Sequence, residues 1–118
     1  MVEMIDKLVN LGHAERLKEL SAIKEGDYLA KTDRNGLLVV KVGSMSVRKK
    51  GDKMELVDFG KYTAFNVSVN PETGEVQSIS EKELSSFYLT PSMLTEVARL
   101  RKDTKLYKKL REIAAKKK

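Results

Sequence analysis

The sequence contains no cysteine and no tryptophan, and His13 is its only histidine among 118 residues. Without cysteine the chain has no disulfide, no thiolate nucleophile and no thiolate ligand for zinc. With one histidine it has no clustered histidine metal site, and His13 is the only histidine that could act as the base of a Ser-His nucleophile pair. These absences argue against nucleophilic catalysis and against a transition-metal site.

Glycine-rich phosphate-binding loops are absent as well. Gly43, Gly51 and Gly60 stand alone in strands or turns, so they match neither a Walker-type nor a dinucleotide-binding pattern. Carboxylates remain for acid–base or magnesium chemistry, but most lie in turn signals, where Asp is favoured for its bonds to the backbone. These carboxylates are Asp27, Asp33, Asp52, Glu55 and Asp58. We therefore expect a non-catalytic protein with no catalytic residue, no cofactor and no metal.

Long hydrophobic runs are also missing. The first residues are interrupted by Glu3, Asp6 and Lys7, which excludes both the apolar core of a signal peptide and a membrane span there. We expect a cytoplasmic protein without integral membrane association. Charged residues make up 34% of the chain, and most of them are Lys and Glu. Such a composition is typical of proteins from thermophiles, so we expect a thermophilic source.

Hydrophobic periodicity changes twice along the chain, from helical to alternating near Gly26 and back to helical near Thr90. Before Gly26, apolar residues recur at helical spacing from Ile5 to Leu20. Gly12 either ends a first short helix, with a second over 13–21, or lies inside one longer helix. The sequence favours two short N-terminal helices.

Residues 27–80 alternate between turn signals and runs rich in Val, Leu, Phe, Tyr and Thr. They predict a four-stranded antiparallel β-meander with strands at about 27–33, 37–48, 54–69 and 75–80. The three connecting turns are Asp33-Arg34-Asn35-Gly36, Lys50-Gly51-Asp52-Lys53 and Asn70-Pro71-Glu72-Thr73-Gly74. Gly60 predicts a bulge or bend. Beyond it we expect one buried face and one polar face, the latter carrying Tyr62 and Asn66.

The C-terminal part predicts helices with a break near Asp103-Thr104. Thr90-Pro91 is a helix-start signal, because threonine caps free amides and proline has none to satisfy. The apolar stripe of residues 93–100 is rotated from that of residues 106–114, so one straight helix does not explain both. The fold class is thus α+β, with a single domain over residues 1–102 and a basic helix or tail over 103–118.

Positive charge is concentrated at the C-terminal end. Residues 99–118 carry ten basic and two acidic side chains, a net +8, whereas the whole chain carries +6. Localised basic charge attracts polyanions more effectively than dispersed charge. A second basic cluster lies at the tip of the central predicted hairpin. The candidate nucleic-acid-binding residues are Arg48, Lys49, Lys50, Lys53, Arg101, Lys102, Lys105, Lys108, Lys109 and Lys116.

These residues indicate a small nucleic-acid-binding protein whose basic hairpin and basic helix straddle a phosphate backbone of DNA or RNA. The competing interpretation of the same lysines is a solvated face or a solubility tail. The alternative function is a protein-interaction or assembly module, most simply a homodimer. Its interface would be the apolar stripe of Leu106, Leu110 and Ile113, unless that stripe buries on its own domain. A third option, an anionic membrane surface, is disfavoured because this stripe is short and lacks Trp and Phe.

Overall fold

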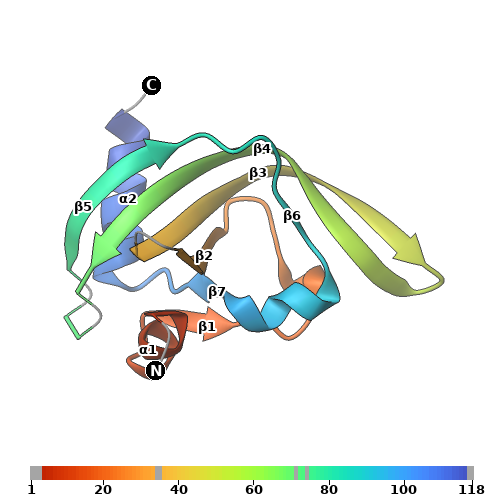
Figure 1. The fold of residues 1–118 in the computed structure, drawn as a ribbon, viewed down its shortest axis with the longest axis horizontal. Helices are drawn as coiled ribbons and strands as arrows, with labels where there is room; N and C mark the ends of the chain where they lie inside the picture. The colour runs from red at the N-terminus through yellow and green to blue at the C-terminus, as the bar shows by residue number, and fades with distance from the viewer. Residues whose placement is uncertain (1–3, 34–35, 71, 74, 117–118) are drawn as a thin grey trace.

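A long bent hairpin, formed by β3 (Gly36–Lys50) and β4 (Lys53–Val69), organises the fold (Figure 1). The computed structural model describes residues 4–33, 36–70, 72–73 and 75–116. The other elements are α1 (Met4–Asn10), β1 (Ala14–Arg16), the 3-10 helix η1 (Leu20–Ala22), β2 (Tyr28–Asp33), β5 (Val76–Lys82), β6 (Tyr88–Leu89), the 3-10 helix η2 (Pro91–Glu96), β7 (Val97–Leu100) and α2 (Lys105–Lys116).

Within these residues the strands form one antiparallel sheet in the order β1-β7-β2-β3-β4-β5, and the short β6 pairs with β4. The α+β class with an antiparallel sheet is confirmed. The predicted meander corresponds to β2-β3-β4-β5, but a four-stranded sheet is wrong because the sheet has seven strands. The added strands β1, β6 and β7 have two to four residues each. Such short strands carry too little alternation to be recognised locally.

The turns of the meander are only partly described. Lys50 and Lys53 pair across the predicted turn between β3 and β4, which confirms that connection. Asp33 pairs with Gly36, so β2 and β3 also form a hairpin. The predicted turn residues Arg34, Asn35, Pro71 and Gly74 lie outside the described residues.

Two glycines mark the bend of the long hairpin. The pairing register shifts between Val42 and Met45, where Gly43 is an extra residue on β3 and Gly60 an extra residue on β4. A β-carbon at Gly43 would lie 2.8 Å from the carbonyl oxygen of Lys61, so the backbones approach too closely for any other residue. The bulge predicted at Gly60 is confirmed.

Both faces of the sheet are buried, because alternate residues of its central strands face two separate cores. The first core contains Val39 and Phe65 together with side chains from α1 and α2. The second contains Val40 and Ala64 together with side chains from η1, η2 and β6. The expectation of a polar face beside Tyr62 is therefore wrong for its central part, where Ala64 is 2% exposed and Tyr62 packs against the second core.

The N-terminal prediction holds for its first helix only. Residues 4–10 form α1, and the chain turns after it at Gly12. Residues 13–21, predicted as a second helix, instead form β1 and lead into η1. Strand β1 pairs with β7, from Ala14 opposite Leu100 to Arg16 opposite Ala98. This pairing across the chain overrides the weak helical periodicity of the segment.

The C-terminal prediction is corrected in the same way. Residues 91–100, predicted as a helix, form η2 and then β7, which inserts between β1 and β2. In β7, Val97 belongs to the second core while Ala98 and Leu100 belong to the first. A short run buried on both faces does not distinguish helix from strand by periodicity. Helix α2 does begin after the predicted break, and the Thr104 hydroxyl accepts the Tyr107 N–H at 3.3 Å.

Candidate nucleic-acid interface

Helix α2 presents its lysines to solvent because its apolar residues are held in the first core. Leu106 and Leu110 are each 0% exposed, and Tyr107 is 8% exposed. At 3.6 residues per turn, burial of this stripe directs the opposite side of the helix outward. The lysines on that side are Lys105, Lys108 and Lys109, and all are exposed.

The loop before α2 carries two further exposed cations. Arg101 and Lys102 are exposed, and Arg101 lies 3.3 Å from Asp103 in an ion pair that water screens strongly. Together these residues form the α2 basic face: Arg101, Lys102, Lys105, Lys108 and Lys109. Five of the ten predicted residues therefore lie exposed on α2 or in the loop directly before it. Lys116 ends α2, and its side chain is outside the described part.

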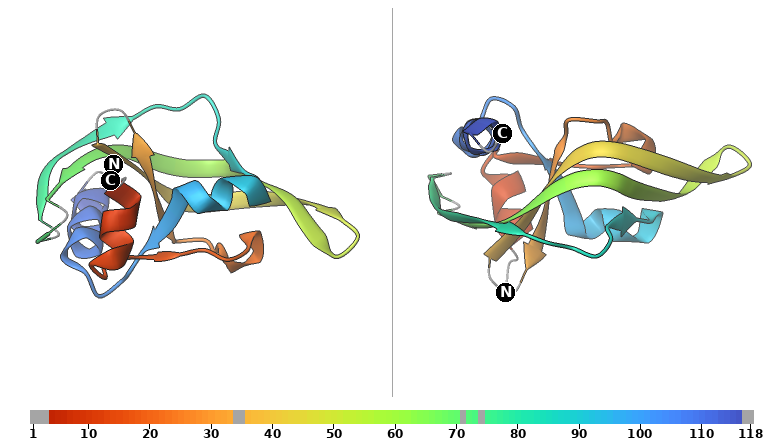
Figure 2. Two further views of the ribbon diagram at one scale, coloured as in Figure 1. Left: turned by 60° about the horizontal axis from the view of Figure 1, so that its bottom comes forward. Right: turned by 90° about the horizontal axis from the view of Figure 1, so that it is seen from above.

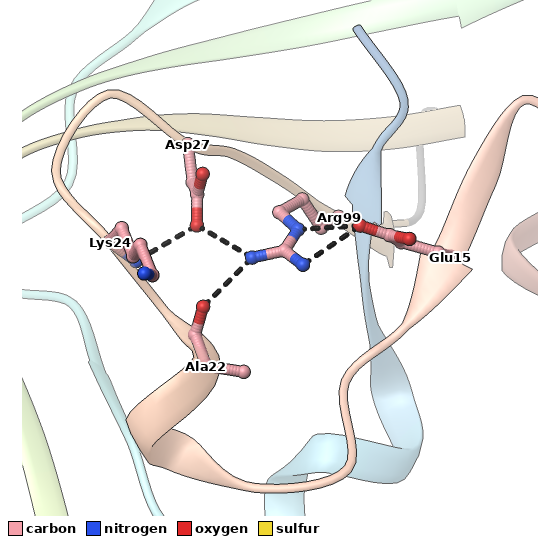
Figure 3. A network of polar contacts seen from close by, with 5 residues as sticks. All are labelled: Glu15, Ala22, Lys24, Asp27 and Arg99. Carbon is pink, nitrogen blue, oxygen red and sulfur yellow. Dashed lines mark hydrogen bonds and ion pairs between the residues drawn. The ribbon is translucent and has the colours of Figure 1, made fainter.

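Arg99 belongs to the basic tail in sequence but is neutralised inside the fold (Figure 3). Its Nε and Nη2 each lie 2.8 Å from Glu15 Oε1. Its Nη1 donates to the carbonyl oxygen of Ala22 at 2.8 Å and to Asp27 Oδ2 at 3.2 Å. Burial lowers the pKa of Arg99, but the bonds and charges of Glu15 and Asp27 outweigh it, so the pKa is raised. The charge of the tail thus overstates the charge available to a partner.

The four other predicted cations lie together at the tip of the β3–β4 hairpin. This hairpin tip consists of Arg48, Lys49, Lys50 and Lys53, all exposed. Lys50 and Lys53 are directly opposite each other, which concentrates like charge at the turn. Arg48 lies 3.9 Å from Glu55 in an exposed pair. A cavity of about 390 Å³ lies between this tip and Pro91 at the start of η2.

The structure does not bring the hairpin tip and the α2 basic face together. In Figure 1 the hairpin ends at the right of the molecule while α2 stands at the left, and both views in Figure 2 agree. The molecule measures 43 Å along this axis. The two clusters are therefore separate surfaces at opposite ends of the molecule, and their joint contact with one phosphate backbone stays a prediction.

Comparison with known proteins adds no identity to these features. No protein-family model, curated protein or solved structure matches the chain. A fold alone does not determine function, which depends on the side chains that a protein exposes and positions.

The proposed oligomer stripe lies mainly inside the chain. Leu106 and Leu110 are fully buried in the first core, and Ile113 is half-buried. Their own domain therefore accounts for the burial of the two leucines, which was one of the two possibilities that the sequence left open. No contact with a second copy is needed to explain these two side chains, and a homodimer stays a prediction.

Two residues of α2 and two of the neighbouring strands, none of them predicted as a site residue, line one cavity. Tyr28, Lys41, Tyr107 and Arg111 line a cavity of about 380 Å³. The sequence could have indicated only that Tyr107 and Arg111 are neighbours, because they are four residues apart on one predicted helix. Their proximity to β2 and β3 follows from the packing of α2 and is not visible in the sequence.

A further cavity lies on the described surface, which carries no metal-binding cluster. A polar cavity of about 960 Å³ separates β4 from the β5–β6 connection, and the Tyr62 hydroxyl spans it by donating to the Leu84 carbonyl oxygen at 2.9 Å. Its charged lining side chains are of both signs. Among the described residues, no three His, Cys, Asp or Glu side chains are grouped so as to hold a metal ion. None of the helices they form has the length and hydropathy of a bilayer crossing.

Proposed function

We propose that this protein is a non-catalytic nucleic-acid-binding protein and that the α2 basic face is its main contact surface. Lysine and arginine bind the phosphate backbone of DNA or RNA by releasing condensed counterions. Such binding depends strongly on salt and weakly on base sequence.

The observation that carries the proposal is the orientation of α2. Its buried leucines leave Lys105, Lys108 and Lys109 on one exposed side of a rigid element. Lysines held on a docked helix lose less conformational freedom on binding than lysines on a disordered tail. A fixed row of cations beside Arg101 and Lys102 is suited to a row of phosphates.

The hairpin tip is a second, independent contact in this proposal. It projects from the opposite end of the molecule (Figure 2), so it meets phosphates remote from those that α2 binds. A duplex carries one charge per about 1.7 Å of axis, so phosphates are available along its whole length. The contribution of the hairpin tip is expected to add to that of α2.

The test uses full-length protein, because removing α2 would also remove Leu106 and Leu110 from the core. Fluorescence anisotropy against duplex DNA, single-stranded DNA and RNA is measured at several salt concentrations. Each phosphate engaged contributes about −0.9 to the slope of log K against log salt on duplex DNA, so five contacts from α2 and its loop give roughly −4 to −5, and contacts of the hairpin tip make the slope steeper. Whichever of duplex DNA, single-stranded DNA and RNA binds most tightly then indicates the nucleic acid that the protein recognises.

Three variants identify the surface. Replacing Lys105, Lys108 and Lys109 by glutamine should reduce the magnitude of the slope by about 3. A matched control replaces the exposed residues Lys7, Lys18 and Lys24 by glutamine. It changes the net charge by the same amount and should leave most of the slope of log K against log salt unchanged. A third variant neutralises Lys49, Lys50 and Lys53 at the hairpin tip.

Two results would contradict the proposal. One is an affinity independent of salt, because phosphate contacts require counterion release. The other is an equal loss from the α2 variant and its control, because binding would then follow net charge and not this surface. Light scattering on the same samples tests the alternative of a homodimer.

A further inference from the structure

The far end of the β3–β4 hairpin is a two-stranded ribbon with no third strand beside it. Strand β6 pairs with β4 at Val57 and Asp58, and the last bonds between β3 and the chain before β2 are made by Val42. Beyond these points, residues 48–56 pair only with each other in the described part of the chain. This segment, the hairpin arm, carries the hairpin tip and extends past η1 and η2 in Figure 1 and in both views of Figure 2.

The dimensions of the hairpin arm match the major groove of B-form DNA. Residues 53–56 of β4 continue for about 13 Å beyond the last residue paired with β6, at about 3.3 Å per residue. The major groove is about 8.5 Å deep and about 12 Å wide, and it admits a two-stranded ribbon. The arm ends in the two-residue turn Gly51-Asp52, where Gly51 has a φ of 63°, so its end is no wider than its two strands.

Cations stand on both faces of the hairpin arm. Successive residues of a strand face opposite sides, so Lys49 and Lys50 point in opposite directions. Lys53 is directly opposite Lys50 and shares its face, and every residue from Arg48 to Lys53 is exposed. A ribbon lying against the outside of one backbone uses a single face, whereas a ribbon inside a groove has a phosphate backbone on either side. The placement of the lysines therefore favours entry into a groove.

We propose that the hairpin arm enters the major groove of duplex DNA, an inference that rests on the nucleic-acid-binding function proposed above. The turn then lies at the floor of the groove, where Lys50 and Lys53 reach the O6 and N7 acceptors of guanine. Arg48 and Lys49 lie nearer the rim and contact the phosphates on its two sides. The α2 basic face holds phosphates elsewhere and has no part in this insertion.

The same geometry selects one class of nucleic acid. The major groove of A-form duplex RNA is deep and narrow, and side chains cannot read it. A single strand has no groove at all. Both therefore offer phosphates to the cations of the arm but no space between two backbones for the arm itself, and duplex DNA should bind most tightly.

The test measures fluorescence anisotropy of the full-length protein on three duplexes of matching sequence. The first is unmodified DNA, the second is DNA in which glucosylated 5-hydroxymethylcytosine fills the major groove, and the third is RNA. The second and third should each bind the wild type about tenfold more weakly than the first, as the loss of one good base-edge contact does. All three carry the same phosphate charge, so electrostatic attraction alone does not produce this difference.

Two variants locate the effect on the hairpin arm. The variant with Lys49, Lys50 and Lys53 replaced by glutamine should bind glucosylated and unmodified DNA with nearly equal affinity, because it has lost the contacts that the sugars obstruct. The matched control has Lys105, Lys108 and Lys109 replaced by glutamine, which removes the same charge from α2. It should bind both duplexes more weakly than the wild type and keep the tenfold difference between them.

Equal affinity of the wild type for glucosylated and unmodified DNA would overturn the proposal, and so would equal affinity for duplex RNA. A tenfold difference that persists in the arm variant would also overturn it, because the sugars would then obstruct another part of the protein. Failure of the proposed function gives a different result, in which the protein binds none of the three duplexes even at low salt. Binding that depends on salt but not on the filling of the groove refutes groove entry alone.

Discussion

Replacing Arg99 by methionine tests whether the network in Figure 3 ties the N-terminal segments to the sheet. Arg99 lies on β7 between β1 and β2, opposite both Glu15 and Leu29. Through Ala22 and Asp27 it also holds the chain between η1 and β2. Methionine matches the arginine side chain as far as about Nε, so the variant keeps the packing of the apolar stem and removes the guanidinium.

The expected cost follows from the burial of the partners. The side chain of Asp27 is 9% exposed, and without Arg99 its Oδ2 keeps only the Lys24 N–H at 2.8 Å. Breaking a fully buried ion pair costs about 3–5 kcal/mol. Because 25% of the Arg99 side chain is exposed, water relieves part of this cost, and we expect about 2–3 kcal/mol. The partner Glu15 is 50% exposed, so Glu15→Gln should cost less than about 1 kcal/mol.

The assay is urea unfolding followed by far-ultraviolet circular dichroism, since the chain has no tryptophan. Asp27→Asn should fall between the other two variants, because an amide oxygen still accepts the Lys24 N–H. The double variant of Arg99 and Asp27 should cost less than the sum of the single variants. A loss below about 0.5 kcal/mol for Arg99→Met, the value of an ordinary surface substitution, would refute the reasoning.

The remaining predictions concern the core, the bulge and pH. Leu110→Ala should lower the free energy of unfolding by about 2–5 kcal/mol without changing oligomeric state, because Leu110 is 0% exposed within its own chain; light scattering checks the second part. Gly43→Ala should cost about 1–3 kcal/mol in thermal unfolding, since its β-carbon would lie 2.8 Å from the Lys61 carbonyl oxygen. Burial raises the pKa of Tyr28 in the fold, so its contribution to stability is complete below the unfolded pKa of about 10 and is lost as pH rises from there through the folded pKa. Compared with Tyr28→Phe, the wild type should therefore lose stability as pH rises above about 10 in chemical unfolding.

The central meander was predictable because its signals are local. Turn residues such as Gly51-Asp52 interrupt alternating apolar runs, and both patterns act over a few residues. The same holds for the start of α2, where Thr104 precedes an amphipathic segment. Strands β1 and β7 were missed because each is stabilised by a partner remote in sequence. Arg99 pairs with Glu15, 84 residues away.

The candidate surface was predictable only as a set of charges. The cations of the α2 basic face were identified from their density, and burial of Leu106 and Leu110 explains why they are exposed. Sequence spacing did not show that the hairpin tip would lie at the other end of the molecule (Figure 1).

The sequence by itself determined the charge partition, the amphipathic character of α2 and the order of the meander strands, because these depend on residue identity and short spacings. The tertiary structure decided which charges are available. It paired Arg99 with Asp27 inside the fold and left Lys105, Lys108 and Lys109 outside. Exposure and pairing arise from contacts between residues far apart in the chain, and no local pattern encodes them.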